Sequence, residues 1–315
     1  MKRTFILHGG SRARALGFSL VELMVASAVG LIVTLAVTGS VLTMGRQFSI
    51  VGANVSAQGS AQIALSLLDA AGRGAGAGFY NNGRLICPTW NAWNGTTVIS
   101  DGAALMPARI VAGASNTAPD TLVFTGATGA GALAALPVME TAAPGANVKI
   151  SNGATLAAGD LAVIGVPGSA LPCTLFQVTN TPSVVAGCSG NATSCQLLVR
   201  TPNSGLNPNP TTFTTDSTFG FTTSALANGP AVVSRVGSAA AGFRQDAFGV
   251  QCNSLVRFNA FVNATAPACT ASPLAFGAGV DAIATDVVMM QAQYGVSASA
   301  ASDVVTQWVE PTGAT

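Results

Sequence analysis

The sequence predicts an α+β protein in which one long N-terminal helix precedes a β-rich globular domain. Residues 18–44 form an apolar run whose only charged residue is Glu22. At 1.5 Å per residue, a helix of that length crosses a ~30 Å hydrocarbon core. Beyond residue 79, short apolar or β-branched segments alternate with Gly, Pro, Asn and Ser, which is typical of antiparallel strands joined by turns.

The composition excludes several classes of function. Of the 315 residues, 13 are Lys or Arg and 12 are Asp or Glu, so only 8% are charged, where soluble domains carry roughly 25%. We expect no nucleic-acid partner, because phosphate binding needs a basic stripe. The hydrophobic content of 49% argues against intrinsic disorder.

The residues before the apolar run are basic and contain no acid: Lys2, Arg3, Arg12 and Arg14. Basic residues before a span favour an N-in topology. A cleaved secretory signal has a shorter apolar core, and a plain anchor does not explain Glu22. A carboxylate in a membrane span usually marks a function. The alternative is that Glu22 lies at the edge of the span and reaches the headgroups.

The segment Gly17-Phe18-Ser19-Leu20-Val21-Glu22 resembles the cleavage motif of type IV prepilins. The resemblance implies that prepilin peptidase cuts between Gly17 and Phe18 and methylates the new amino group of Phe18. It also implies that Glu22, the fifth mature residue, pairs with the N-terminal amine of a neighbouring subunit and sets the register between packed helices. Cleavage would remove His8, the only histidine.

Later segments resemble PilW-type minor pilins. They are the Cys-led segment 173–179, Leu255-Val256-Arg257, the QYGV segment 287–296 and Asp69-Ala70-Ala71-Gly72 at the expected helix end. In that family a further strand follows the QYGV strand, whereas this sequence stops at Thr315. The resemblance implies a pilin-like fold and a minor pilin that helps to initiate type IV pilus assembly and lies at or near the filament tip.

The partners that this resemblance implies are prepilin peptidase, other minor and major pilins bound through their N-terminal helices, the inner-membrane assembly machinery and a tip adhesin. The expected location is the bacterial inner membrane, crossed once, with a periplasmic domain that later enters the pilus. Two alternatives stay open. One is a J-like pseudopilin of type II secretion. The other is a membrane-anchored adhesin or carbohydrate-binding module, for which Trp90 and Trp93 would supply a stacking platform.

The predicted organisation is a leader (1–17), a transmembrane assembly helix (18–45), an amphipathic continuation with a Gly-rich connector (46–78) and a β-rich periplasmic or extracellular domain (79–315). The continuation is expected to pack on the following domain through a face made of Phe48, Val51, Val55, Ile63, Leu67 and Ala70. Strands are expected near 109–111, 121–125, 161–166, 174–179, 196–200, 232–236, 255–261 and 286–294.

The six cysteines all lie beyond the membrane span, in the part that an N-in anchor places in an oxidising compartment. Six cysteines allow 15 connectivities. From the positions of the cysteines we expect Cys87–Cys173, Cys188–Cys195 and Cys252–Cys269. No C-x-x-C pair indicates a metal, no cofactor motif is present, and the mature chain cannot form a Ser-His-Asp or Cys-His site. We therefore expect no enzyme.

Overall fold

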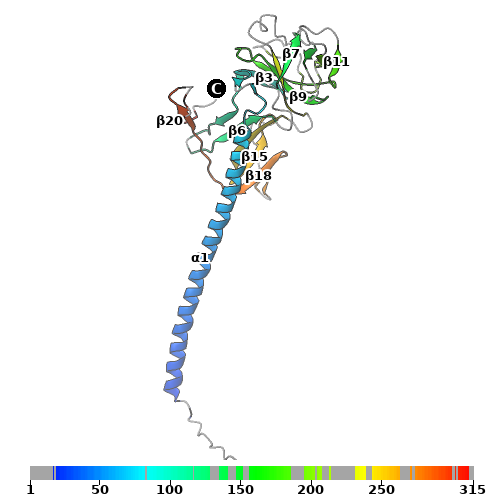
Figure 1. Ribbon diagram of the computed structural model, residues 1–315. Helices are drawn as coiled ribbons and strands as arrows, with labels where there is room; N and C mark the ends of the chain where they lie inside the picture. The colour runs from blue at the N-terminus through cyan, green and yellow to red at the C-terminus, as the bar shows by residue number, and fades with distance from the viewer. Residues whose placement is uncertain are drawn as a thin grey trace, which may run out of the picture. The chain divides into compact units, whose positions relative to one another are not determined.

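The computed structural model describes residues 17, 19–81, 84–115, 117–127, 135–140, 147–151, 156–185, 195–202, 204–207, 213, 231–238, 243–262, 270–271, 274–299, 302 and 304–311. The chain divides into two compact units, Met1–Gln58 and Gly59–Thr315. In the first unit the residues from Leu20 onward are helical, and the described strands all lie in the second unit (Figure 1). The predicted α+β class, with one long helix and a β-rich domain, is confirmed.

Helix α1 extends over Leu20–Gly74, a length of 55 residues. It ends in a glycine-rich turn, where Gly76 and Gly78 adopt positive φ values of 82° and 81° that glycine tolerates best. This connector is held in place, because the Gly76 amide donates to the Thr125 carbonyl and the Ala127 amide donates to the Ala77 carbonyl. The helix end is therefore tied to the end of strand β6 (Thr121–Gly126).

A nine-stranded sheet in the described part of the chain has the order β11-β12-β8-β7-β13-β9-β10-β3-β4. All its neighbours are antiparallel except β10 and β3, which are parallel. The strands are β3 (Thr89–Trp93), β4 (Val98–Ala104), β7 (Ala135–Glu140), β8 (Val148–Ile150), β9 (Asp160–Gly165), β10 (Cys173–Gln177), β11 (Ser183–Val185), β12 (Cys195–Leu198) and β13 (Val232–Ser238).

The centre of this sheet is buried on both faces. Every residue of β9 is buried. Its even-numbered Ala162 and Ile164 join one apolar cluster, and its odd-numbered Leu161 and Val163 join another. The side-chain period of two in a strand produces this division. It also explains why β9 reads as a continuous apolar run instead of an alternating one.

A five-stranded antiparallel sheet has the order β18-β15-β14-β6-β5. Its strands are β5 (Ala108–Val111), β6 (Thr121–Gly126), β14 (Arg244–Gln251), β15 (Ser254–Asn259) and β18 (Val280–Thr285). One face packs on the last turns of α1, where Ala64 and Leu68 contact a cluster that contains Phe248 and Leu255 (Figure 1). The other face carries a separate apolar cluster around Val123 and Phe258.

Three two-stranded pairs complete the described strands: β1 (Tyr80–Asn81) with β2 (Arg84–Leu85), β16 (Thr270–Ala271) with β17 (Leu274–Ala275), and β19 (Tyr294–Ser297) with β20 (Val305–Val309). The sequence led us to expect that the chain stops without a strand after the QYGV segment. Strand β20 corrects that expectation, since it pairs antiparallel with β19.

The strand predicted over 286–294 is wrong. Strand β18 ends before it, and the next strand starts only at Tyr294. Asp286 has a left-handed backbone with φ 61°, which turns the chain out of the sheet. Residues after it bond to separate places: the Val287 amide donates to the Asn253 carbonyl, and the Met290 carbonyl accepts from the Asp120 amide. No single neighbouring strand pairs with this segment.

Cys87 and Cys173 form a disulfide with a Cα–Cα distance of 5.6 Å, which is one of the three pairs expected from the sequence. The bond joins the segment after β2 to the first residue of β10, and both cysteines are fully buried. Cys195 and Cys252 are also disulfide-bonded. Cys188 and Cys269 lie outside the described residues, so the pairs Cys188–Cys195 and Cys252–Cys269 stay predictions.

Candidate processing and assembly helix

The predicted processing site lies just before α1. Gly17 is exposed, and a Cβ added to it would meet no atom within 4 Å. The packing of the described residues therefore does not require glycine at position 17. Recognition by a peptidase would explain why a glycine is present there. The leader residues 1–16 and Phe18 lie outside the described residues. Glu22 occupies the first turn of α1, where the positive end of the helix dipole favours a carboxylate.

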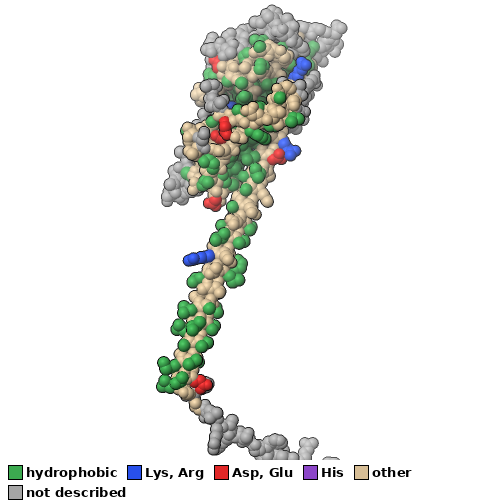
Figure 2. All heavy atoms as spheres, turned by 90° about the vertical axis from the view of Figure 1, so that its left-hand side faces the viewer, with side chains coloured by type: hydrophobic (Ala, Val, Ile, Leu, Met, Phe, Trp, Pro, Cys, Tyr) green, Lys and Arg blue, Asp and Glu red, His purple; other side chains and the backbone are tan. Residues whose placement is uncertain are grey.

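The stretch of α1 from Leu23 to Gly45 contains no charged residue. All helix residues from 20 to 59 are exposed, including large apolar side chains such as Leu31, Ile32 and Leu42. Figure 2 shows hydrophobic side chains along this part of the helix. It is long and apolar enough to cross a membrane, and none of its most apolar window is buried in the chain.

The hydroxyl groups in this apolar stretch are bonded within the helix. Ser27 donates to the Met24 carbonyl at 2.9 Å, Thr34 to the Leu31 carbonyl at 2.9 Å and Thr38 to the Thr34 carbonyl at 2.7 Å. Ser40 and Thr43 each donate to the backbone carbonyl four residues earlier in the helix. Because a polar group without a partner is costly in hydrocarbon, these bonds make the stretch compatible with a lipid surrounding.

Three glycines follow at intervals of seven residues: Gly45, Gly52 and Gly59. A Cβ at any of them would meet nothing within 4 Å. Glycine inside a helix costs roughly 1 kcal/mol relative to alanine, and no packing within this chain requires it. Seven-residue spacing places the three along one helix face, where the lack of side chains permits another helix to approach closely.

The helix face that packs on the β domain differs from the predicted one. Over 59–74 the buried or half-buried positions are Ser60, Ala64, Leu68 and Ala71. The predicted face contained Ile63, which is 56% exposed, and Leu67, which is 38% exposed. That prediction was wrong by about one residue around the helix, since Ala64 and Leu68 make the contact while Ile63 and Leu67 stay exposed.

The comparisons with known proteins bear on this N-terminal region. Residues 12–38 match the family described as the prokaryotic N-terminal methylation motif. The motif supports a type IV pilin-like or pseudopilin protein. It implies processing by prepilin peptidase and assembly with pilus-type machinery, and it fits a membrane-anchored pilin whose role is structural. No curated protein and no solved structure matched the chain.

The tryptophan platform considered from the sequence is not formed. Trp90 is only 5% exposed and packs on Phe243, with ring centroids 5.7 Å apart. Asn91 is fully buried, and its Oδ1 accepts a hydrogen bond from the Gly102 amide at 2.7 Å. These residues belong to the interior of the nine-stranded sheet. Among the residues that the structure describes, no group of three His, Cys, Asp or Glu side chains could hold a metal ion.

Proposed function

We propose that the protein is a minor pilin of the PilW type, which helps to initiate type IV pilus assembly and lies at or near the filament tip. The observation that carries the proposal is the prepilin motif at the start of an apolar helix that has no partner in its own unit. A helix that is apolar all round is stable only inside lipid or among other helices. The chain therefore supplies a helix for both surroundings, first the inner membrane and then the filament.

Glu22 is the residue that we propose to set the register. It is the only charged residue between the leader and Arg46. Among packed apolar helices, a carboxylate requires a positively charged partner. The amine of a neighbouring mature N-terminus at Phe18 has the required charge. Major and other minor pilins, or a tip adhesin, would be the neighbours.

The test is the substitution Glu22→Ala in the native bacterium, with Leu23→Ala as the matched control. We expect Glu22→Ala to enter the inner membrane as well as the unchanged protein, because removing a charge makes insertion easier. We expect its amount in sheared surface filaments to fall by roughly tenfold or more, since breaking a buried charge pair is strongly destabilising. Leu23→Ala should stay near the unchanged level.

Two results would contradict the proposal. One is loss of membrane insertion by Glu22→Ala with normal assembly of whatever is inserted. The other is unchanged filament content. Deleting the gene for this protein distinguishes a type IV pilus from a type II secretion system. A minor pilin is required for surface pili, whereas a J-like pseudopilin is required for protein export. Loss of protein export with normal pili would assign the protein to a type II secretion system instead of a type IV pilus.

A further inference from the structure

The five-stranded sheet has a second face, on the side away from its contact with α1. The strand registers place Arg109 of β5 beside Val123 of β6, and Val123 beside Ala247 of β14. The next row pairs Val111 with Thr121. Because neighbours in register share a face, these five residues point to the same side of the sheet. Of these five residues only Arg109 and Thr121 are polar.

This face contains a cavity at Gly249, which has no side chain. Gly249 of β14 lies between Thr121 and Phe258, and a Cβ at Gly249 would approach Thr121 Oγ1 to 3.1 Å and the Phe258 ring to 3.9 Å. A cavity of about 190 Å³ opens here, with Val111, Val123 and Phe258 in its wall. A water molecule needs only roughly 10–15 Å³ by this type of measure, so the cavity has room for a small organic group.

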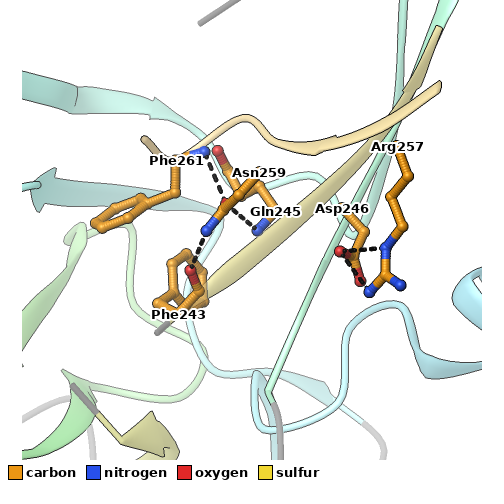
Figure 3. A network of polar contacts seen from close by, with 6 residues as sticks. All are labelled: Phe243, Gln245, Asp246, Arg257, Asn259 and Phe261. Atoms are coloured by element: carbon orange, nitrogen blue, oxygen red, sulfur yellow. Dashed lines mark hydrogen bonds and ion pairs between the residues drawn. The ribbon is translucent and has the colours of Figure 1, made fainter. Parts of the chain in front are cut away.

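Arg109 lines this cavity and also a second one of about 100 Å³. Within the described residues its half-buried guanidinium has no ion pair and no hydrogen-bond partner. Two other arginines of the domain are paired. Arg257 pairs with Asp246 at 3.0 Å on the helix-facing side of the same sheet (Figure 3), and Arg235 pairs with Asp160 at 2.8 Å. A cation beside apolar walls favours an anionic ligand.

The second cavity is lined by both apolar and polar side chains, with Thr125 and Gln245 among the polar ones. Gln245 is buried, and its Nε2 donates to Thr125 Oγ1 at 3.3 Å. The Gln245 backbone is fixed, since its amide donates to Asn259 Oδ1 at 3.1 Å while Asn259 Nδ2 donates to the Phe243 carbonyl at 3.2 Å (Figure 3). Arg109 therefore lines two cavities, and the second one adds polar groups beside the guanidinium.

We propose that this face of the five-stranded sheet binds an organic carboxylate that carries a small apolar group. Arg109 pairs with the carboxylate, and the cavity at Gly249 takes the apolar group against Val123 and Phe258. The ligand is either a free carboxylic acid or the C-terminal residue of a peptide, since both present the same carboxylate beside an apolar side chain. This binding function goes beyond helix assembly and does not depend on it.

The experiment uses the full chain in lipid nanodiscs, with empty nanodiscs as the blank, and calorimetric and saturation-transfer titrations. The probes are 4-methylpentanoate for a free acid, N-acetyl-leucine for a peptide end and 4-methylpentanamide as the neutral counterpart. We expect saturable binding of at least one of the two acids below about 20 mM, and binding of the amide weaker by roughly tenfold or more. The acid that binds more tightly identifies the source.

Three variants locate the site. Arg109→Gln should weaken acid binding by roughly tenfold or more, Arg109→Lys should restore part of it, and Arg84→Gln, which makes the same change at an exposed arginine, should leave it unchanged. Thermal unfolding of Arg109→Gln close to that of the unchanged chain shows that the fold is intact. The proposal is overturned if neither acid binds saturably, if the amide binds equally well, or if Arg109→Gln binds as the unchanged chain does.

Discussion

The two units of the chain use apolar residues in opposite ways. In Met1–Gln58 the large apolar side chains of α1 are exposed, and no described residue of that unit covers them. In Gly59–Thr315 the same residue types are buried on both faces of β9 and across the five-stranded sheet. The second unit therefore forms apolar cores of its own, whereas the exposed apolar helix of the first unit needs partners outside the chain. The predictions below test that difference.

The largest effect on the β domain is expected from Cys87→Ser. The disulfide to Cys173 closes a loop of 86 residues, for which the chain-entropy account gives about 4.5 kcal/mol of stability. Urea unfolding of the full chain in nanodiscs, followed by tryptophan fluorescence, measures the loss. Processing and membrane insertion should be unchanged, because the first unit does not contain the bond. A variant that unfolds like the unchanged chain would contradict this expectation.

A matched pair of substitutions in α1 compares the two units directly. Ala64→Glu places a carboxylate in the contact with Phe248 and Leu255, and we expect a loss of about 3 kcal/mol of domain stability. Ala57→Glu makes the same change in the exposed first unit and should leave unfolding unchanged. It should lower the amount of protein in sheared filaments instead. Equal destabilisation by both variants would mean that the division between the units is wrong.

A smaller loss is expected from Arg235→Gln. The hydrogen bonds that Arg235 donates to Asp160 raise the pKa of its guanidinium above the ordinary value; burial opposes this rise, and the charge of Asp160 adds to it. A raised pKa in the folded state gives stability that is complete below the unfolded pKa and disappears only as the pH rises through the folded one. We expect a loss of about 2 kcal/mol, equal at pH values of roughly 6 and 10. Urea titrations at the two pH values, with Arg84→Gln as control, measure this loss of stability.

A loss that is smaller at the higher pH would contradict the raised pKa of Arg235.

The smallest effect is expected at the end of α1. Arg73 and Asp69 form an exposed pair one turn apart, with an N–O distance of 2.8 Å. Such pairs contribute at most about 0.5 kcal/mol. Asp69→Asn should therefore change domain unfolding only slightly, and less at high salt, as measured by the same urea titration. A loss as large as that of Ala64→Glu would show that the helix end is held by this pair and not by its apolar contact.

Local patterns made the first unit predictable and left much of the second unit hidden. Gly17, Glu22 and the apolar run are neighbours in sequence, so the motif could be recognised directly. Strand β9 was predicted because its run is continuously apolar. Strands β3 and β14 were missed. In β3 the buried Asn91 interrupts the apolar pattern, and its Oδ1 accepts a hydrogen bond from the Gly102 amide eleven residues away. The isolation of Arg109 likewise depends on strands that come together from distant parts of the sequence.

The central claim is that α1 is a processed prepilin helix. The most direct measurement is the mass of the mature N-terminal peptide from cells with and without prepilin peptidase. We expect a peptide that begins with N-methylated Phe18 in the first strain and a retained leader in the second. Gly17→Arg should keep the leader in both strains, whereas Gly17→Ala should still be cut. A mature protein from peptidase-competent cells that still contains Lys2 or Arg3 would contradict the claim.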